Sequence, residues 1–94
     1  MEKETILVKV KVEGIYPPGE DVVELPHGAT LKVLLDNLKN MGNRFVPYLF
    51  DAKTGEYLVK VALINDESVL QKDFKRVTLL EGDRVFFILL VSGG

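Results

Sequence analysis

The sequence ends on a pair of glycines, Gly93 and Gly94, which follow closely after a long apolar run. Glycine has no Cβ and accepts unusual backbone dihedrals, so a tail of two glycines is thin enough to pass close to other groups. A carboxylate is a poor electrophile, and it must first be joined to a good leaving group such as AMP before a nucleophile can attack it. We therefore expect Gly94 to carry the functional group and Gly93 to give it a slender approach to the ATP site of an activating enzyme.

The apolar run before the tail extends without interruption from Val85 to Val91. It is far shorter than the roughly 20 residues of a transmembrane helix, and its β-branched and aromatic residues predict a strand buried in the middle of a sheet. Alternate residues of a strand point to opposite faces. One face therefore carries Val85, Phe87, Leu89 and Val91, and the other carries Phe86, Ile88 and Leu90.

Only one of these two faces can pack against a helix in a domain of this size, yet both are apolar. An exposed apolar patch commonly marks a partner site. We therefore predict partner binding by the end of this strand and the start of the tail: Phe86, Phe87, Ile88, Leu89, Leu90, Val91 and Ser92. The alternative is that the segment 43–56 folds back over the second face and covers it.

The first half of the sequence predicts a hairpin followed by a helix. Ile6, Val8, Val10 and Val12 alternate with Thr5, Leu7, Lys9 and Lys11, as in a half-buried strand, and residues 21–25 resume as its partner. Thr30 is a candidate N-cap and Gly42 a candidate C-cap. Between them, one helix face of about three turns collects the apolar side chains Leu31, Leu34, Leu35, Leu38 and Met41.

The second half predicts further strands. Pro47 makes residues 45–50 an edge strand or an irregular segment, and residues 51–56 form a turn. Residues 57–64 form the next strand, which the turn 65–67 closes, and residues 68–80 have room for a short strand and one helical turn. A last turn at residues 80–83 leads into the final strand.

This element order predicts an α+β domain in which one main helix packs on one face of a mixed sheet of about five strands. The outline is that of the β-grasp, or ubiquitin-like, fold. We expect residues 1–94 to form a single domain, from which residues 92–94 extend as a flexible tail.

Composition and charge argue against several other classes of function. A formal net charge of −2 argues against nucleic-acid binding. The sequence has no cysteine, which excludes disulfides and thiol chemistry. His27, the single histidine, lies in a predicted turn, and the acidic residues have no metal-ligand spacing. We expect a protein that is not itself an enzyme, binds no metal or membrane and, lacking a signal peptide, is cytoplasmic.

The residues around the final strand resemble a known family. Residues 80–87 read LEGDRVFF and residues 91–94 read VSGG, which is similar to the C-terminal motif of the MoaD/ThiS sulfur carriers. These are the small subunit of molybdopterin synthase and the thiamine sulfur carrier. Residues 61–66 and the helix ending near Gly42 are also similar to the family, so the resemblance extends over most of the chain.

The resemblance implies a carrier function. In the family, a ubiquitin-activating-type enzyme uses ATP to adenylate the terminal glycine, and sulfur then replaces AMP to give a thiocarboxylate. Carried over to this sequence, Gly94 bears the thiocarboxylate and no cofactor is bound by the carrier itself. The implied partners are the adenylating enzyme and, in the molybdopterin branch, the large subunit of molybdopterin synthase or an equivalent sulfur acceptor.

One position departs from the molybdopterin branch. Its members often have Pro-Pro before the tail, where this sequence has Leu89 and Leu90. The length of the chain and the segment 43–60 still favour that branch over the shorter thiamine carriers. Three alternatives stay open: a thiamine-pathway carrier, a ubiquitin-like modifier joined to lysines through Gly94, and a non-catalytic β-grasp binding module.

Overall fold

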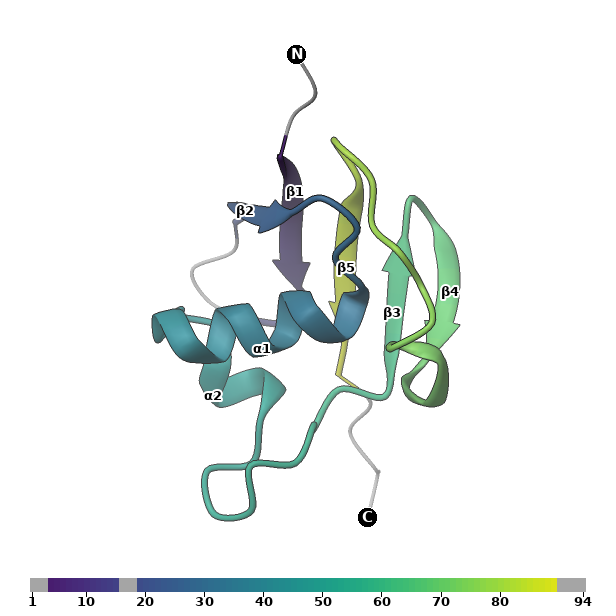
Figure 1. The fold of residues 1–94 in the computed structure, drawn as a ribbon. Coiled ribbons are helices and arrows are strands. Elements are labelled where there is room, and N and C mark those ends of the chain that lie inside the picture. Colours follow the sequence, from purple (N-terminus) through teal and green to yellow (C-terminus); the bar gives the residue numbers. More distant parts are fainter. Residues whose placement is uncertain (1–3, 16–18, 90–94) are drawn as a thin grey trace.

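The computed structural model describes residues 4–15 and 19–89, which form one mixed sheet with a helix across one face (Figure 1). The strands are β1 (Thr5–Val12), β2 (Asp21–Pro26), β3 (Val61–Ile64), β4 (Glu67–Leu70) and β5 (Arg84–Ile88). The helices are α1 (Leu31–Met41), α2 (Val46–Leu49) and the 3-10 turn η1 (Gln71–Asp73). The strand order is β2-β1-β5-β3-β4, with β1 and β5 parallel and the other pairs antiparallel. This is the predicted β-grasp.

The alternation in β1 produces the predicted half-buried strand. Ile6, Val8, Val10 and Val12 are buried, while the residues between them are exposed. β2 pairs with it antiparallel, with Val8 opposite Val23, and buries Val23 and Leu25 on the same face. The hairpin therefore gives the core a continuous apolar surface on the side that α1 covers.

Helix α1 begins and ends where its caps were predicted. The Thr30 Oγ1 accepts a hydrogen bond from the Val33 N–H at 3.3 Å, and Gly42 ends the helix with φ of 65°. Leu31, Leu34, Leu35 and Leu38 are all fully buried. The inclusion of Met41 in this face was wrong: Met41 is 61% exposed. It belongs to the last turn, where the helix has already passed beyond the edge of the sheet (Figure 1).

The prediction of an edge strand or irregular segment at residues 45–50 was wrong. Val46–Leu49 form one helical turn, α2, in which Pro47 lies in the first turn, where no intrahelical N–H bond is lost. The Asn43 Oδ1 accepts from the Phe45 N–H at 2.8 Å just before it. The helical turn brings Phe45, Leu49 and Phe50 onto one side, and all three are buried.

The strand predicted at residues 57–64 is shorter than expected. β3 occupies only Val61–Ile64, whereas Tyr57 makes an isolated bridge to Phe50. The turn to β4 is formed as predicted: Asn65 and Asp66 both have positive φ, the backbone that a tight two-residue hairpin requires. Residues 68–80 contain the predicted short strand and helical turn, as the end of β4 and η1.

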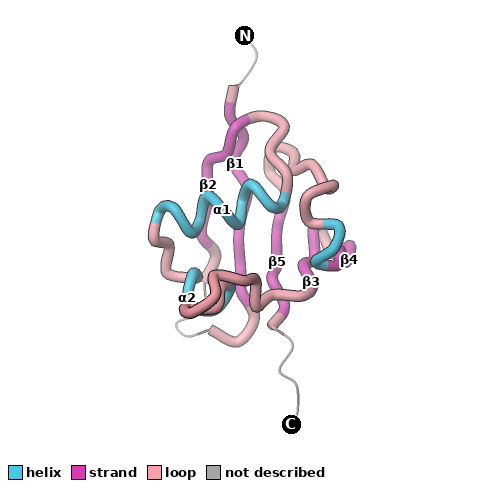
Figure 2. Tube along the Cα trace, turned by 60° about the horizontal axis from the view of Figure 1, so that its bottom comes forward, coloured by secondary structure: helices cyan, strands magenta, loops and turns pink. Residues whose placement is uncertain are grey.

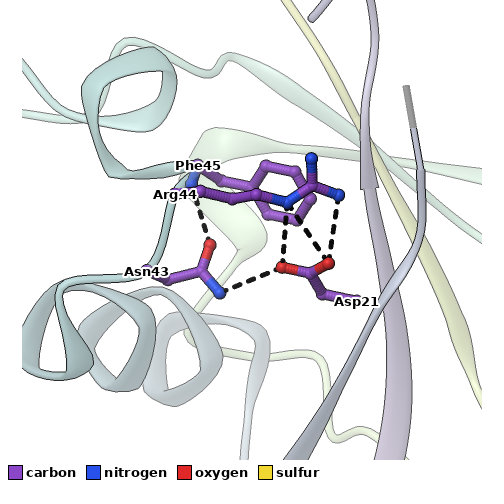
Figure 3. A network of polar contacts seen from close by, with 4 residues as sticks. All are labelled: Asp21, Asn43, Arg44 and Phe45. Carbon is purple, nitrogen blue, oxygen red and sulfur yellow. Dashed lines mark hydrogen bonds and ion pairs between the residues drawn. The ribbon is translucent and has the colours of Figure 1, made fainter. Parts of the chain in front are cut away.

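A polar network holds the segment after α1 against the start of β2 (Figure 3). The Arg44 guanidinium donates to Asp21 at 3.0 Å, and the Asn43 amide donates to the same carboxylate at 3.3 Å. Arg44 also stacks over the Phe45 ring, 4.6 Å from its centroid. The hydrogen bond from Arg44 holds the pKa of the Asp21 carboxyl below its ordinary value, an effect that burial opposes.

Replacement Asp21→Asn is expected to lower stability at neutral pH by about 0.2–1 kcal/mol. The Arg44 side chain is 40% exposed, so solvent screens the pair. Since the folded-state pKa of Asp21 is depressed, its contribution is present above the unfolded-state pKa and is lost as the pH falls below about 4. Urea unfolding at a series of pH values should show the difference between wild type and variant shrink in acid. A difference that grew in acid would contradict this assignment.

Candidate functional site

Strand β5 lies at the centre of the sheet and leads into the C-terminal residues. It pairs in parallel with β1, with Val10 opposite Val85, and antiparallel with β3, with Ala62 opposite Phe87. Hydrogen bonds continue beyond these ladders, since the Glu13 N–H donates to the Phe87 carbonyl at 2.9 Å. β5 is thus held on both edges up to the point where the chain leaves the sheet.

The entry into β5 is fixed by side-chain hydrogen bonds that no local sequence pattern predicts. The Asn65 side chain donates to Asp83 at 2.9 Å and accepts from the Arg84 N–H at 3.0 Å. The other carboxylate oxygen of Asp83 accepts from the Leu80 N–H at 2.8 Å. The β3–β4 turn and the turn before β5 therefore lock together, which fixes the register of β5.

The inner face of β5 belongs to the core. Val85 and Phe87 are essentially unexposed, and the half-buried Leu89 packs against the same cluster. The Phe87 side chain therefore does not reach the outer surface, unlike Phe86, with which it was grouped as a candidate partner-binding residue. Leu90, Val91, Ser92, Gly93 and Gly94 lie outside the described residues, so their predicted roles stay predictions.

The outer face of the sheet carries apolar side chains next to one another. Phe86 pairs with Leu63, Ile88 with Val61, and Val61 with Leu70, and paired residues point to the same side. Four of the five are half-buried, and Leu70 is 51% exposed. We call Val61, Leu63, Leu70, Phe86 and Ile88 the outer patch. Its members from β3 and β4 were not predicted, because the strand pairing that joins them to β5 was unknown.

The segment 43–56 does not cover the outer face of the sheet, so the alternative stated from the sequence was wrong. Phe45, Leu49 and Phe50 join the core cluster on the side of α1, and Figures 1 and 2 show α2 on the same side of the sheet as α1. The segment therefore closes the helix side and leaves the outer patch uncovered by it.

The outer patch has a polar rim. A hollow of about 230 Å³ beside Phe86 and Leu63 is lined by charged groups of both signs, including Lys11, Arg84 and Asp66. An apolar centre with a charged rim is the usual anatomy of a protein interface. Within residues 4–15 and 19–89, no group of three or more histidine, cysteine or acidic side chains is placed to hold a metal ion. No helix in those same ranges could cross a membrane.

Comparison with known proteins identifies the family. The family model described as "ThiS family" matches residues 11–94. This chain belongs to the ThiS family. The match extends over most of the chain and includes both Gly93 and Gly94. ThiS family members are small sulfur carriers rather than catalytic enzymes, which agrees with the resemblance found in the C-terminal residues.

A solved structure supports the fold. The solution structure of the Haloferax volcanii HVO 2177 protein has a TM-score of 0.70 to this ThiS family chain at 22% sequence identity. The alignment covers 100% of this chain and 92% of the other. At this identity the likeness establishes the fold alone. No curated protein matches this chain in sequence.

Proposed function

We propose that this chain is a sulfur carrier loaded at the Gly94 carboxyl and that it donates sulfur in molybdopterin biosynthesis. The observation that carries the proposal is the family match, which continues through Gly93 and Gly94. The complete absence of cysteine supports it, because a carrier without thiols has the main-chain carboxyl as its site for transferable sulfur.

The loading reaction has two steps. First, a Gly94 carboxylate oxygen attacks the α-phosphorus of ATP on the adenylating enzyme, and pyrophosphate leaves. Hydrosulfide then attacks the acyl carbon, AMP leaves, and loss of the proton from sulfur gives the thiocarboxylate. The carrier contributes an acyl group that can enter a narrow site, which is the role proposed for the small residues Ser92, Gly93 and Gly94.

The fold favours this role because it presents the tail from a rigid base. β5 is hydrogen-bonded on both edges, and Val85 and Phe87 fix it to the core. We propose that the outer patch binds the adenylating enzyme and afterwards the sulfur acceptor, with Phe86 and Ile88 contributed by the strand that leads toward the tail. One surface, which includes the strand that leads toward the tail, would then guide the same acyl group to two partners in turn.

The molybdopterin branch is favoured by the segment between α1 and β3. Residues 43–60 add the turn α2 and three buried aromatic or aliphatic side chains to the helix side of the core, Phe45, Leu49 and Phe50. In its length and in this segment, the chain resembles the molybdopterin branch more than the shorter thiamine carriers. The acceptor would then be the large subunit of molybdopterin synthase.

Intact mass spectrometry tests the loading step. The protein is incubated with ATP, sulfide and the adenylating enzyme from its own source, and we expect a product heavier by the difference between sulfur and oxygen. Loaded protein should then convert the pterin precursor when the synthase large subunit is added. An unchanged mass, with a known carrier converting in parallel, would show that the tail is not an acyl carrier.

A further inference from the structure

Lysine side chains gather on the helix side of the molecule, away from the outer patch. A hollow of about 570 Å³ lies between α1 and the residues that follow α2, and Lys32, Lys39 and Lys60 line it. An adjoining hollow of about 260 Å³ shares Lys32 and adds Lys72 and Lys75. Tyr57 and Gln71 line both. We call the two hollows with these five lysines the basic groove.

The basic groove concentrates charge in an otherwise acidic molecule. Its five lysines face two acidic residues, Asp36 and Glu56. The whole chain has 12 basic and 14 acidic residues, so the remainder holds seven basic and twelve acidic ones. A molecule with a negative overall charge therefore carries a distinctly positive cleft, which attracts negatively charged partners during encounter.

Most of these ammonium groups lack an internal counterion. Lys32 pairs with Asp36 at 2.8 Å, and the Lys39 ammonium lies 5.3 Å from the centre of the Phe50 ring. In the part of the chain that the structure describes, Lys60, Lys72 and Lys75 make no ion pair, and all three are exposed. Three neighbouring cations are thus available to an external acid.

A neutral phenol, that of Tyr57, lies in the middle of the groove. Burial raises the pKa of Tyr57, and the negative charge of Asp36 raises it further, so the phenol stays protonated at neutral pH. The Gln71 side chain is fixed by its hydrogen bond to the Val59 carbonyl at 2.8 Å. The groove is therefore lined, between its lysines, by the partly buried Tyr57 and the hydrogen-bonded Gln71.

The groove is not built for a single phosphate. Phosphate sites commonly use free backbone N–H groups at the start of a helix. The first N–H groups of α1 are already used: Leu31 donates to the Val77 carbonyl, Lys32 to the Phe74 carbonyl and Val33 to the Thr30 hydroxyl. What remains is a set of side-chain charges distributed over two adjoining hollows. Such a distributed set suits several carboxylates along one chain.

We propose that the basic groove binds an extended acidic segment of a partner protein. Charge complementarity carries the proposal, since successive carboxylates of one segment could reach Lys60 in the first hollow and Lys72 and Lys75 in the second. The groove lies on the side of the sheet opposite the outer patch, so a partner held there leaves the outer patch free. The proposal does not depend on any chemistry at Gly94.

The test is fluorescence anisotropy with a labelled peptide of alternating glutamate and serine at low ionic strength. We expect binding that the double variant Lys60→Glu/Lys72→Glu weakens about tenfold or more. The matched control is Lys9→Glu/Lys11→Glu, which changes the net charge equally on the outer face of the sheet and should weaken binding less than about twofold. Added salt should weaken the wild-type complex. Since all four lysines are exposed, circular dichroism should show every variant folded.

Three results would overturn the proposal. If the peptide does not bind, the proposal is wrong. If the control variant loses as much affinity for the peptide as the groove variant, the effect is one of overall charge and not of the groove. Saturable binding of inorganic phosphate or ATP to the groove, seen as chemical-shift changes at Tyr57 and Gln71 without a response to the peptide, would make it a small-anion site. Neither the peptide nor the two variants involve Gly94, so the outcome is independent of sulfur loading.

Discussion

Addition of one alanine after Gly94 is expected to abolish thiocarboxylate formation. The acyl carbon to be adenylated would then belong to alanine, whose Cβ lies where glycine leaves free space. The former Gly94 carboxyl would become an unreactive amide. Because the reaction occurs at one terminal atom, we expect loss below detection rather than a graded decrease. Intact mass after incubation with ATP, sulfide and the adenylating enzyme measures it directly.

The matched control for this variant is the same alanine added before Met1. Both additions change length and mass equally and leave every core residue that the structure describes unchanged, so the two proteins should unfold at the same urea concentration. The N-terminal addition should convert as the wild type does. Full conversion of the C-terminal addition would mean that the alanine carboxyl is loaded in place of glycine, which would contradict the requirement for Gly94 as the terminal residue.

The parts of the fold that could be predicted from sequence are those set by local pattern. The alternation in β1 and the spacing of four leucines in α1 each predict which face is buried. Thr30 and Gly42 cap α1 by hydrogen bonds to residues close to them in the sequence. The final strand was recognisable because its apolar run is too short to span a membrane and is rich in β-branched and aromatic residues. Together these elements were enough to predict the β-grasp.

The errors arose where tertiary contacts override local preference. Pro47 suggested an edge strand, but it is equally compatible with a first helical turn, and burial of Phe45 and Leu49 decides between the two. The outer patch joins β3, β4 and β5, and the basic groove joins lysines from Lys32 to Lys75. Neither set is periodic in sequence, so only the strand order and the packing of the loops reveal them.

The two neighbouring phenylalanines of β5 are expected to respond very differently to truncation. Phe87 is completely buried and lies between Val12 and Ala62 in the sheet, so Phe87→Ala should cost about 3–5 kcal/mol. Domains of this kind are stabilised by only about 5–15 kcal/mol in total, so this variant should be partly unfolded in mild denaturant. Phe86 is half-buried on the outer patch, and Phe86→Ala should cost less than about 1.5 kcal/mol.

Urea unfolding monitored by circular dichroism compares the two variants, and the same proteins can then be assayed for binding to the adenylating enzyme. Phe86→Ala should unfold near the wild-type midpoint but bind more weakly, since it removes the one aromatic ring of the outer patch. Equal destabilisation by both variants would mean that both faces of β5 are core. Unchanged binding by a folded Phe86→Ala would move the partner surface elsewhere, and the basic groove on the opposite side of the sheet would then be the next surface to test.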